Sequence, residues 1–381
     1  MKQRLFSLLL CGAMLLSMCP PGLALEAEVG QAGADTPTLL ADNVPYLDAD
    51  GSTNTCAAAT EVTSDDTAWS DGWYVVSGDV TISSRVTVTR DVHLILADGY
   101  SLTVTGGINV SEGNSLTIYG QSGGTGALIA TGADGNAGIG GNNGSNGGTI
   151  TINGGDVTAQ ASQFAAGIGG GETGGGGTIT INGGTVTAKN TYWGIAFGSA
   201  GIGGNGEGGT IVITGGTVTA DGGKGPGIGG SKNSRVIVSG GTVTASSMLA
   251  AGIGSIYGDI NSVTFSTGQD GNAFITASSI EDDSGKIDWH GVIFEGDSGQ
   301  IYGSSIILGA NAEIPNSKTL TIKDGQTLTI PDDVSLSNKG TIIVKPGGKL
   351  VGDISGSGTV HFLPLAEQFP ILTPGETYWF D

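Results

Sequence analysis

An internal repeat occupies the centre of the chain and constrains its fold more than any other feature. One unit reads Gly-Gly-Thr-Ile-Thr-Ile-Asn-Gly-Gly-Thr-Val-Thr-Ala, then a loop, then Ala-Gly-Ile-Gly-Gly, then a second loop. A valine recurs at spacings of 29, 32 and 25 residues, at Val157, Val186, Val218 and Val243. The glycine-flanked isoleucines are Ile139, Ile168, Ile202, Ile228 and Ile253. The two-strand block Thr-Ile-Thr-Ile-Asn-Gly-Gly-Thr-Val-Thr-Ala therefore has a constant length. Only the two loops that flank Gly-Ile-Gly vary in length.

A constant block between variable loops predicts one coil of a solenoid per unit, with three short strands joined by turns. Alternation along each strand places every second side chain inside. Stacking aligns these side chains in four interior columns: Ile150, Ile179, Ile211 and Val236; Ile152, Ile181, Ile213 and Val238; Val157, Val186, Val218 and Val243; and Ala159, Ala188, Ala220 and Ala245. Asn153 and Asn182 share the turn position before Gly-Gly, where an Asn side chain can hydrogen-bond its stacked neighbour.

The predicted fold is therefore an all-β, right-handed parallel β-helix with three short strands per coil. We prefer the right-handed form because a left-handed hexapeptide helix tolerates variation in loop length poorly. An antiparallel sandwich is the alternative, and it would need hairpin turns at regular spacing.

Composition and charge exclude several other classes. Glycine accounts for 72 of the 381 residues, which argues against a helical bundle because glycine destabilises a helix interior. Proline is scarce and no Gly-X-Y period occurs, so the chain is not a collagen. The formal net charge of −21 argues against a nucleic acid or an anionic membrane as a partner bound by basic patches.

The first 24 residues have the pattern of a secretory signal peptide. Lys2 and Arg4 precede the apolar run Leu5–Met18, which is shorter than the ~20 residues that a membrane span needs. Cleavage after Ala24 leaves 12 basic and 35 acidic residues, hence a net charge of −23, and no expected membrane span in the mature chain. It also leaves Cys56 as the single cysteine, so no internal disulfide is possible. We expect an exported protein, secreted or displayed on a bacterial surface.

The remaining chain divides by pattern into five predicted segments. They are an acidic flexible leader (25–70), N-terminal coils or a cap (71–136), regular glycine-rich coils (137–254), irregular C-terminal coils (255–361) and a tail (362–381). The tail ends on aromatic residues without a polar cap, which suggests truncation.

Residues 71 to 360 resemble a family of large bacterial cell-surface proteins with the pectate-lyase-like right-handed β-helix. The resemblance rests on the opening Gly72-Trp73-Tyr74-Val75-Val76, on the stretch Asp91–Gly99, and on the repeated Gly-Gly-Thr-Val-Thr-Ala and Ala-Gly-Ile-Gly-Gly. It implies an adhesin-like or carbohydrate-binding role at the cell surface. We know of no catalytic motif common to the family.

Charged side chains are too few in the repeats to predict an enzyme. Those between Ala137 and Gly254 occupy different positions in their coils, so few are expected to converge. The pairs Asp282-Asp283 and Asp332-Asp333 are expected to be solvated loop acids, and His93, His290 and His361 to be surface or packed histidines. We therefore expect no catalytic residues, no metal site and no cofactor.

One loop is longer than its counterparts and carries the predicted binding site. The insertion after Ala188 contains Lys189, Tyr192 and Trp193, and aromatic faces on an exported scaffold can stack on sugar rings. We predict carbohydrate binding at these three residues, with neutral glycans favoured by the negative charge. The alternative is that the aromatic side chains fold back over the coil.

The sequence thus predicts a secreted or surface-displayed, non-enzymatic β-helix that is adhesin-like or glycan-binding. A polysaccharide lyase or glycoside hydrolase on a β-helix is one alternative, and a purely structural spacer is the other. Outward Thr-x-Thr pairs such as Thr185 and Thr187 also resemble an ice-binding face, although threonine simply suits an exposed strand.

Overall fold

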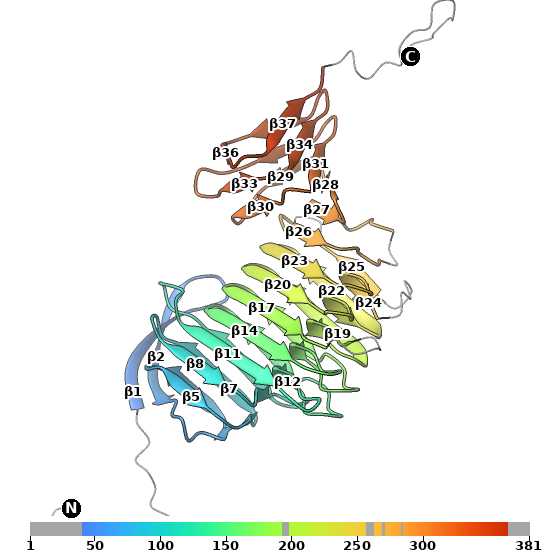
Figure 1. Ribbon diagram of the computed structural model, residues 1–381. Helices are drawn as coiled ribbons and strands as arrows, with labels where there is room; N and C mark the ends of the chain where they lie inside the picture. Colours follow the sequence, from blue (N-terminus) through green and yellow to red (C-terminus); the bar gives the residue numbers. More distant parts are fainter. Residues whose placement is uncertain (1–39, 193–197, 257–262, 269–270, 283–284, 365–381) are drawn as a thin grey trace, which may run out of the picture. The chain divides into compact units, whose positions relative to one another are not determined.

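The computed structural model describes residues 40–192, 198–256, 263–268, 271–282 and 285–364 (Figure 1). In these ranges the chain is all-β and winds as a right-handed parallel β-helix, as predicted. None of the described residues belongs to a helix that is long and apolar enough to cross a membrane.

Three sheets, here called A, B and C, form the sides of the β-helix. Sheet A contains, in spatial order, β1 (Leu40–Leu47), β2 (Thr53–Glu61), β4 (Gly72–Val76), β7 (Asp91–Leu96), β10 (Ser115–Tyr119), β13 (Thr149–Ile152), β16 (Thr178–Ile181), β19 (Glu207–Ile213), β22 (Lys232–Val238) and β25 (Val263–Ser266). Sheet B contains β3 (Ala68–Trp69), β6 (Val86–Val88), β9 (Ile108–Asn109), β12 (Ile139–Gly140), β15 (Ile168–Gly169), β18 (Ile202–Gly203), β21 (Ile228–Gly230) and β24 (Ile253–Ser255). Sheet C begins with β5 (Val80–Ile82), β8 (Ser101–Val104), β11 (Ala127–Gly132), β14 (Asp156–Ala161), β17 (Thr185–Asn190), β20 (Thr217–Asp221), β23 (Thr242–Ser246) and β26 (Phe274–Ala277).

The strand register confirms the interior columns. The aligned positions in sheet A are Ile150, Ile179, Ile211 and Val236, and those in sheet C are Val157, Val186, Val218 and Val243. All eight side chains are at most 1 % exposed. The repeat strands pair in parallel throughout, so the alternative of an antiparallel sandwich is wrong.

The second glycine of Gly-Ile-Gly is required by the close approach of successive coils. Gly203 in β18 has φ +131°, and a Cβ atom there would lie 1.8 Å from the carbonyl oxygen of Gly229 in the next coil. Gly140 and Gly169 meet the following coil in the same way, at 1.9 and 2.0 Å. Any side chain at this position would both strain the backbone and overlap the neighbouring strand.

The turns between sheets A and C carry the predicted amide ladder. Asn182 Nδ2 donates to Asn153 Oδ1 at 2.9 Å, and Thr214 Oγ1 donates to Asn182 Oδ1 at 2.7 Å. The hydrogen bonds therefore run from one coil to the next along the axis of the stack.

Arg85 fastens the first coils from within the B side of the stack. Its guanidinium donates at 2.7 to 3.2 Å to the carbonyl oxygens of Gly106, Ala137, Gly140 and Gly141 and to Oδ1 of Asn142. All of these acceptors are neutral, and burial lowers the pKa of Arg85 to about 10. The side chain is therefore a half-buried cation at neutral pH whose hydrogen bonds go mainly to backbone carbonyl groups.

Replacing Arg85 with methionine should lower the free energy of unfolding by about 2–3 kcal/mol, because several buried carbonyl groups would lose their donor. Urea denaturation of Arg85→Met measures this loss. Arg235 is exposed on β22, so Arg235→Met is the matched control and should be almost neutral. Equal losses in the two variants would contradict the role assigned to Arg85.

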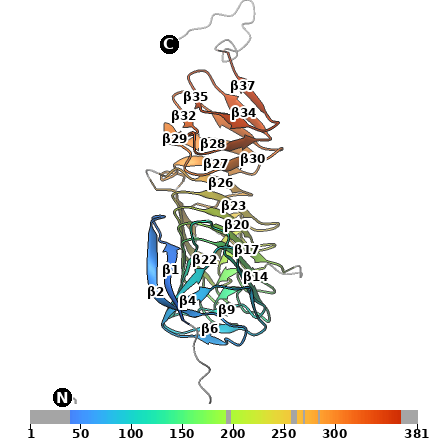
Figure 2. The ribbon, with the colours of Figure 1, turned by 90° about the vertical axis from the view of Figure 1, so that its left-hand side faces the viewer.

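Residues 40–70 correct the prediction of a flexible leader. The strands β1 and β2 form an antiparallel hairpin, and the end of β2 pairs with β4 at Thr60 and Glu61 (Figure 2). The amide of Leu47 donates to the carbonyl of Gly120 at 2.9 Å, which fastens the hairpin to a later coil. The sequence concealed this hairpin because its acidic, Ala- and Thr-rich strands show little apolar alternation.

An aromatic cluster on the outer face of sheet A holds the hairpin in place. Tyr46 of β1 packs on Trp73 and Tyr119 with ring centroids 4.9 and 4.7 Å apart, and Trp73 stacks on His93 at 4.4 Å. Burial, together with the charge of Asp48, raises the pKa of Tyr119 to about 12. Its phenol therefore stays protonated at neutral pH, and its oxygen lies at hydrogen-bond distance, 3.1 Å, from His93 Nδ1. His93 is thus a packed histidine, as expected.

The C-terminal residues form a second stack instead of irregular coils of the first. Sheet C continues through β27 (Gly291–Glu295), β28 (Ser298–Tyr302), β31 (Thr319–Ile322), β34 (Thr341–Val344) and β37 (Thr359–Phe362). The other two sides are β29 (Ser305–Ile307), β32 (Thr327–Thr329) and β35 (Lys349–Val351), and β30 (Ala312–Ile314), β33 (Leu336–Asn338) and β36 (Ile354–Ser355). The turn between β27 and β28 makes an antiparallel pair, so strand direction in sheet C reverses there.

The hydrophobic core changes face at this hairpin. Ile275 and Ile293 point into the first core, whereas Phe274, Val292 and Phe294, on the same two strands, point into the second. Reversing the strand direction and exchanging the faces together amount to a half-turn about the stack axis, which preserves the hand of the coil. The second stack therefore remains right-handed.

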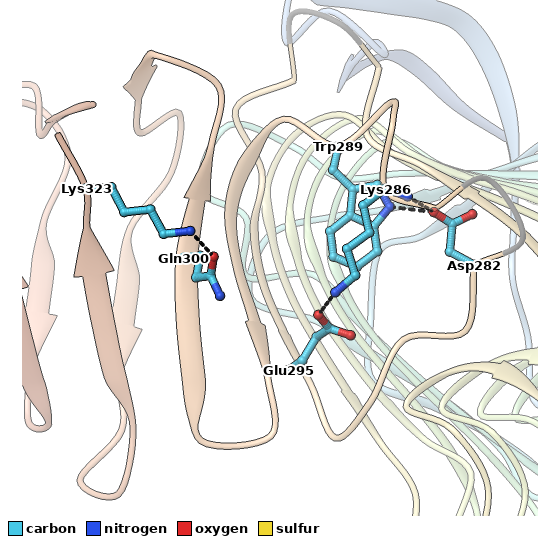
Figure 3. Close-up of polar contacts among 6 residues, drawn as sticks. All are labelled: Asp282, Lys286, Trp289, Glu295, Gln300 and Lys323. Atoms are coloured by element: carbon cyan, nitrogen blue, oxygen red, sulfur yellow. Dashed lines mark hydrogen bonds and ion pairs between the residues drawn. The ribbon is translucent and has the colours of Figure 1, made fainter. Parts of the chain in front are cut away.

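Trp289 belongs to the first core, and Figure 3 shows it beside Asp282, Lys286 and Glu295. Trp289 is 5 % exposed and packs edge-on against Phe265, 5.2 Å between centroids. Its indole N–H donates to Asp282 Oδ2 at 2.7 Å, and Lys286 Nζ lies 4.5 Å from the ring centroid while pairing with Glu295. Asp282 is therefore a structural acceptor, which corrects the expectation of a solvated acid; Asp283 lies outside the described residues.

Candidate functional site

A groove of about 520 Å³ lies at the corner where sheet B turns into sheet A. We call it the polar groove, and its exposed polar side chains are Glu112, Asn146, Thr149, Thr173, Thr178, Glu207 and Lys232. Most of its other lining residues are glycines, which allow a ligand to approach the backbone closely. Its volume lies within the range of small-molecule sites.

Four of these side chains occupy one column along the stack. Glu207 is paired in register with Lys232, and both lie four residues before an interior residue of sheet A, Ile211 or Val236. Asn146 and Glu112 lie four residues before the aligned Ile150 and Leu116. Since strands are ~4.8 Å apart, the column from Glu112 to Lys232 extends over about 19 Å.

Hydrogen bonds hold the acidic and amide groups of this column. Asn146 Nδ2 donates to Glu112 Oε2 at 3.1 Å, and the amide of Gly175 donates to Asn146 Oδ1 at 2.7 Å. Asn233 Nδ2 donates to Glu207 Oε1 at 3.0 Å, so Glu207 is held toward the following coil. Each of the two carboxylates retains acceptor capacity for a ligand.

The spacing of the two carboxylates limits their chemistry. Glu112 and Glu207 are three coils apart, which corresponds to about 14 Å. An inverting glycosidase needs its two carboxyl groups about 6.5–9.5 Å apart, and a retaining enzyme needs about 5–5.5 Å. The column therefore suits contacts with successive parts of an extended ligand better than attack on one bond.

Sequence reasoning missed this column. The expectation that the few charges occupy different positions is wrong for Glu207 and Lys232, which share one register position. Each lies 11 residues before its column valine, Val218 or Val243. The same counting that aligned the interior could have found them.

The predicted binding residues lie elsewhere on the coils. Lys189 projects from the outer face of β17, and Tyr192 follows in the loop toward sheet B, where its ring lies 4.7 Å from that of Phe164. The amide of Tyr192 donates to Asn190 Oδ1 at 2.9 Å. Trp193 lies outside the described residues. Carbohydrate binding at these residues stays a prediction, with Phe164 as an aromatic neighbour that the sequence did not indicate.

The outward threonines of sheet C align in register as expected. Thr185, Thr217 and Thr242 form one outer column, and Thr187, Thr219 and Thr244 form another. Thr242 Oγ1 donates to the carbonyl of Asn311 at 2.7 Å, so the second stack contacts this face. Among the described residues, no three His, Cys, Asp or Glu side chains gather where they could hold a metal ion.

A family model described as a beta helix repeat matches residues 150–172, 179–207, 211–232 and 236–258. These four stretches begin at Ile150, Ile179, Ile211 and Val236, which form the first interior column. Each of them is similar to a beta helix repeat. No curated protein and no solved structure matches the chain. The match thus supports the fold and the repeat unit found by counting.

Proposed function

We propose that the protein is an exported, adhesin-like β-helix that binds glycans without cleaving them, and that the polar groove is its binding surface. The observation that carries this proposal is the column of exposed Glu112, Asn146, Glu207 and Lys232 beside a glycine-rich wall. Carboxylate and amide groups hydrogen-bond sugar hydroxyls, and a column along the stack can contact successive residues of one glycan chain.

Binding rather than cleavage is favoured by the distance of about 14 Å between the two groove carboxylates. The net charge of −21 would repel acidic glycans, so the preferred ligand is neutral. Export to a bacterial surface is supported by the leader Met1–Ala24 and by the absence of a second cysteine after cleavage.

A glycan array probed with the full-length protein tests this proposal. We expect binding to neutral oligosaccharides, and we expect Asn146→Ala to weaken it about tenfold because one bridging side chain is lost. Asn143 is an exposed asparagine of the same corner turn that does not line the groove, so Asn143→Ala is the matched control and should bind normally.

Two outcomes would favour the alternative functions, an enzyme or a structural spacer. Steady release of shorter products from a bound polysaccharide would indicate an enzyme. Failure to bind any neutral or acidic glycan, with the protein folded by circular dichroism, would favour a structural spacer.

A further inference from the structure

A second cavity, of about 280 Å³, lies beneath the turn of the β1–β2 hairpin. We call it the hairpin pocket. Its roof includes Leu47 and Asp48, and its floor comes from the sheet A to sheet C turns of three successive coils, at residues 121–124, 153–155 and 182–184. The pocket belongs to a different corner of the β-helix from the polar groove.

The roof is fastened directly to the floor. Besides the bond from the Leu47 amide to Gly120, Gln121 Nε2 donates to the carbonyl of Pro45 at 2.8 Å. The floor contains Gly154 and Gly155, which are buried, and Gly183 and Gly184, which are half-buried. The cavity is therefore built by the docking of the hairpin and is lost without it.

The amide ladder ends in this pocket with an unused donor. Asn153 is only 9 % exposed, and its Oδ1 accepts from Asn182. In the preceding coil the aligned residue is Tyr119. Tyr119 has no side-chain amide, and its hydroxyl group is hydrogen-bonded to His93. Asn153 Nδ2 therefore has no hydrogen-bond partner among the described residues, although it lines the pocket. Because this donor lies in the lining of the pocket, it is available to a ligand oxygen.

Asp48 supplies the complementary acceptor. Its Oδ1 accepts from the amide of Ala49 at 2.8 Å and its Oδ2 from Asn54 Nδ2 at 3.2 Å. A carboxylate has about four acceptor sites, so it can still accept from a hydroxyl group. A ligand that offers both oxygen acceptors and hydroxyl donors fits these two groups, whereas an anion would be repelled by Asp48.

We propose that the hairpin pocket binds one residue of an uncharged, polyhydroxylated ligand, such as a hexose unit. The volume lies just below the range of about 300–1,000 Å³ for drug-sized ligands, which suits a single sugar ring. This site is separate from the polar groove and does not depend on the function proposed for it.

Saturation-transfer difference NMR on the full-length protein, with methyl glycosides of glucose, galactose and mannose, tests the proposal. We expect transfer to at least one of these glycosides and weaker transfer to the methyl glycoside of glucuronic acid. Asn153→Asp keeps the acceptor used by Asn182 but removes the donor, and should weaken binding at least tenfold. Ser122→Trp narrows the exposed rim of the pocket without touching the ladder, and should have the same effect.

Asn143→Ala is again the control and should leave the transfer unchanged. No transfer to any neutral glycoside, or equal transfer in the wild type and in a folded Ser122→Trp variant, would overturn the proposal. Loss of transfer in Asn146→Ala with retention in Ser122→Trp would place the sugar in the polar groove, which overturns this proposal while supporting the groove. Equal transfer to the glucuronoside would contradict the role of Asp48.

Discussion

Replacing Gly203 with alanine is expected to lower the free energy of unfolding by about 3–5 kcal/mol. The new Cβ would lie 1.8 Å from the carbonyl oxygen of Gly229, and the φ of +131° is one that residues with a side chain rarely adopt. Backbone strain and forced displacement of the next coil each cost about 1–3 kcal/mol. Urea denaturation followed by circular dichroism measures the change.

The matched control for this substitution is Gly78→Ala. Gly78 has no positive φ, and a Cβ there would meet nothing within 4 Å. This variant should be as stable as the wild type, or more stable by up to about 1 kcal/mol because alanine restricts the unfolded chain. A Gly203→Ala variant as stable as Gly78→Ala would show that the coils can separate at sheet B without cost.

Replacing Val218 with aspartate should be similarly severe. Val218 is 1 % exposed in the column of β17, β20 and β23, and its neighbours Val186 and Val243 offer no partner for a carboxylate. An unpaired buried charge costs about 3–5 kcal/mol. The same denaturation measurement should show an unfolding transition at much lower urea concentration.

Thr217→Asp tests the assignment of the two faces of the strand. Thr217 precedes Val218 in β20 and is exposed on the outer face. An aspartate there remains hydrated, so the expected change is within about 0.5 kcal/mol. Similar destabilisation by Thr217→Asp and Val218→Asp would contradict the assignment of Val218 to the interior and of Thr217 to the outer face.

The polar groove could have been predicted from residue spacing in the repeat, whereas the hairpin pocket could not. Glu207 and Lys232 lie at one position of the repeat, so their proximity follows from the interval to Val218 and Val243. The pocket is lined by both Asp48 and Asn153, which are far apart in the sequence. They come to the same pocket only because a hairpin without a strong strand pattern docks on the coils. No local signal connects them.

The sequence alone determined the coil. A parallel stack places equal positions of successive repeats side by side, so a constant interval between Ile150, Val157 and their counterparts is enough to define the register, the interior columns and the amide ladder. Only the tertiary structure showed how the first stack of coils is covered at its N-terminal end and where the second core begins. The β1–β2 hairpin is held by Tyr46, Trp73 and Tyr119, and the second core begins where Phe274 and Phe294 turn to the opposite face of sheet C. Both depend on contacts between segments that are not copies of one another. The spacing of the repeat contains no information about such contacts.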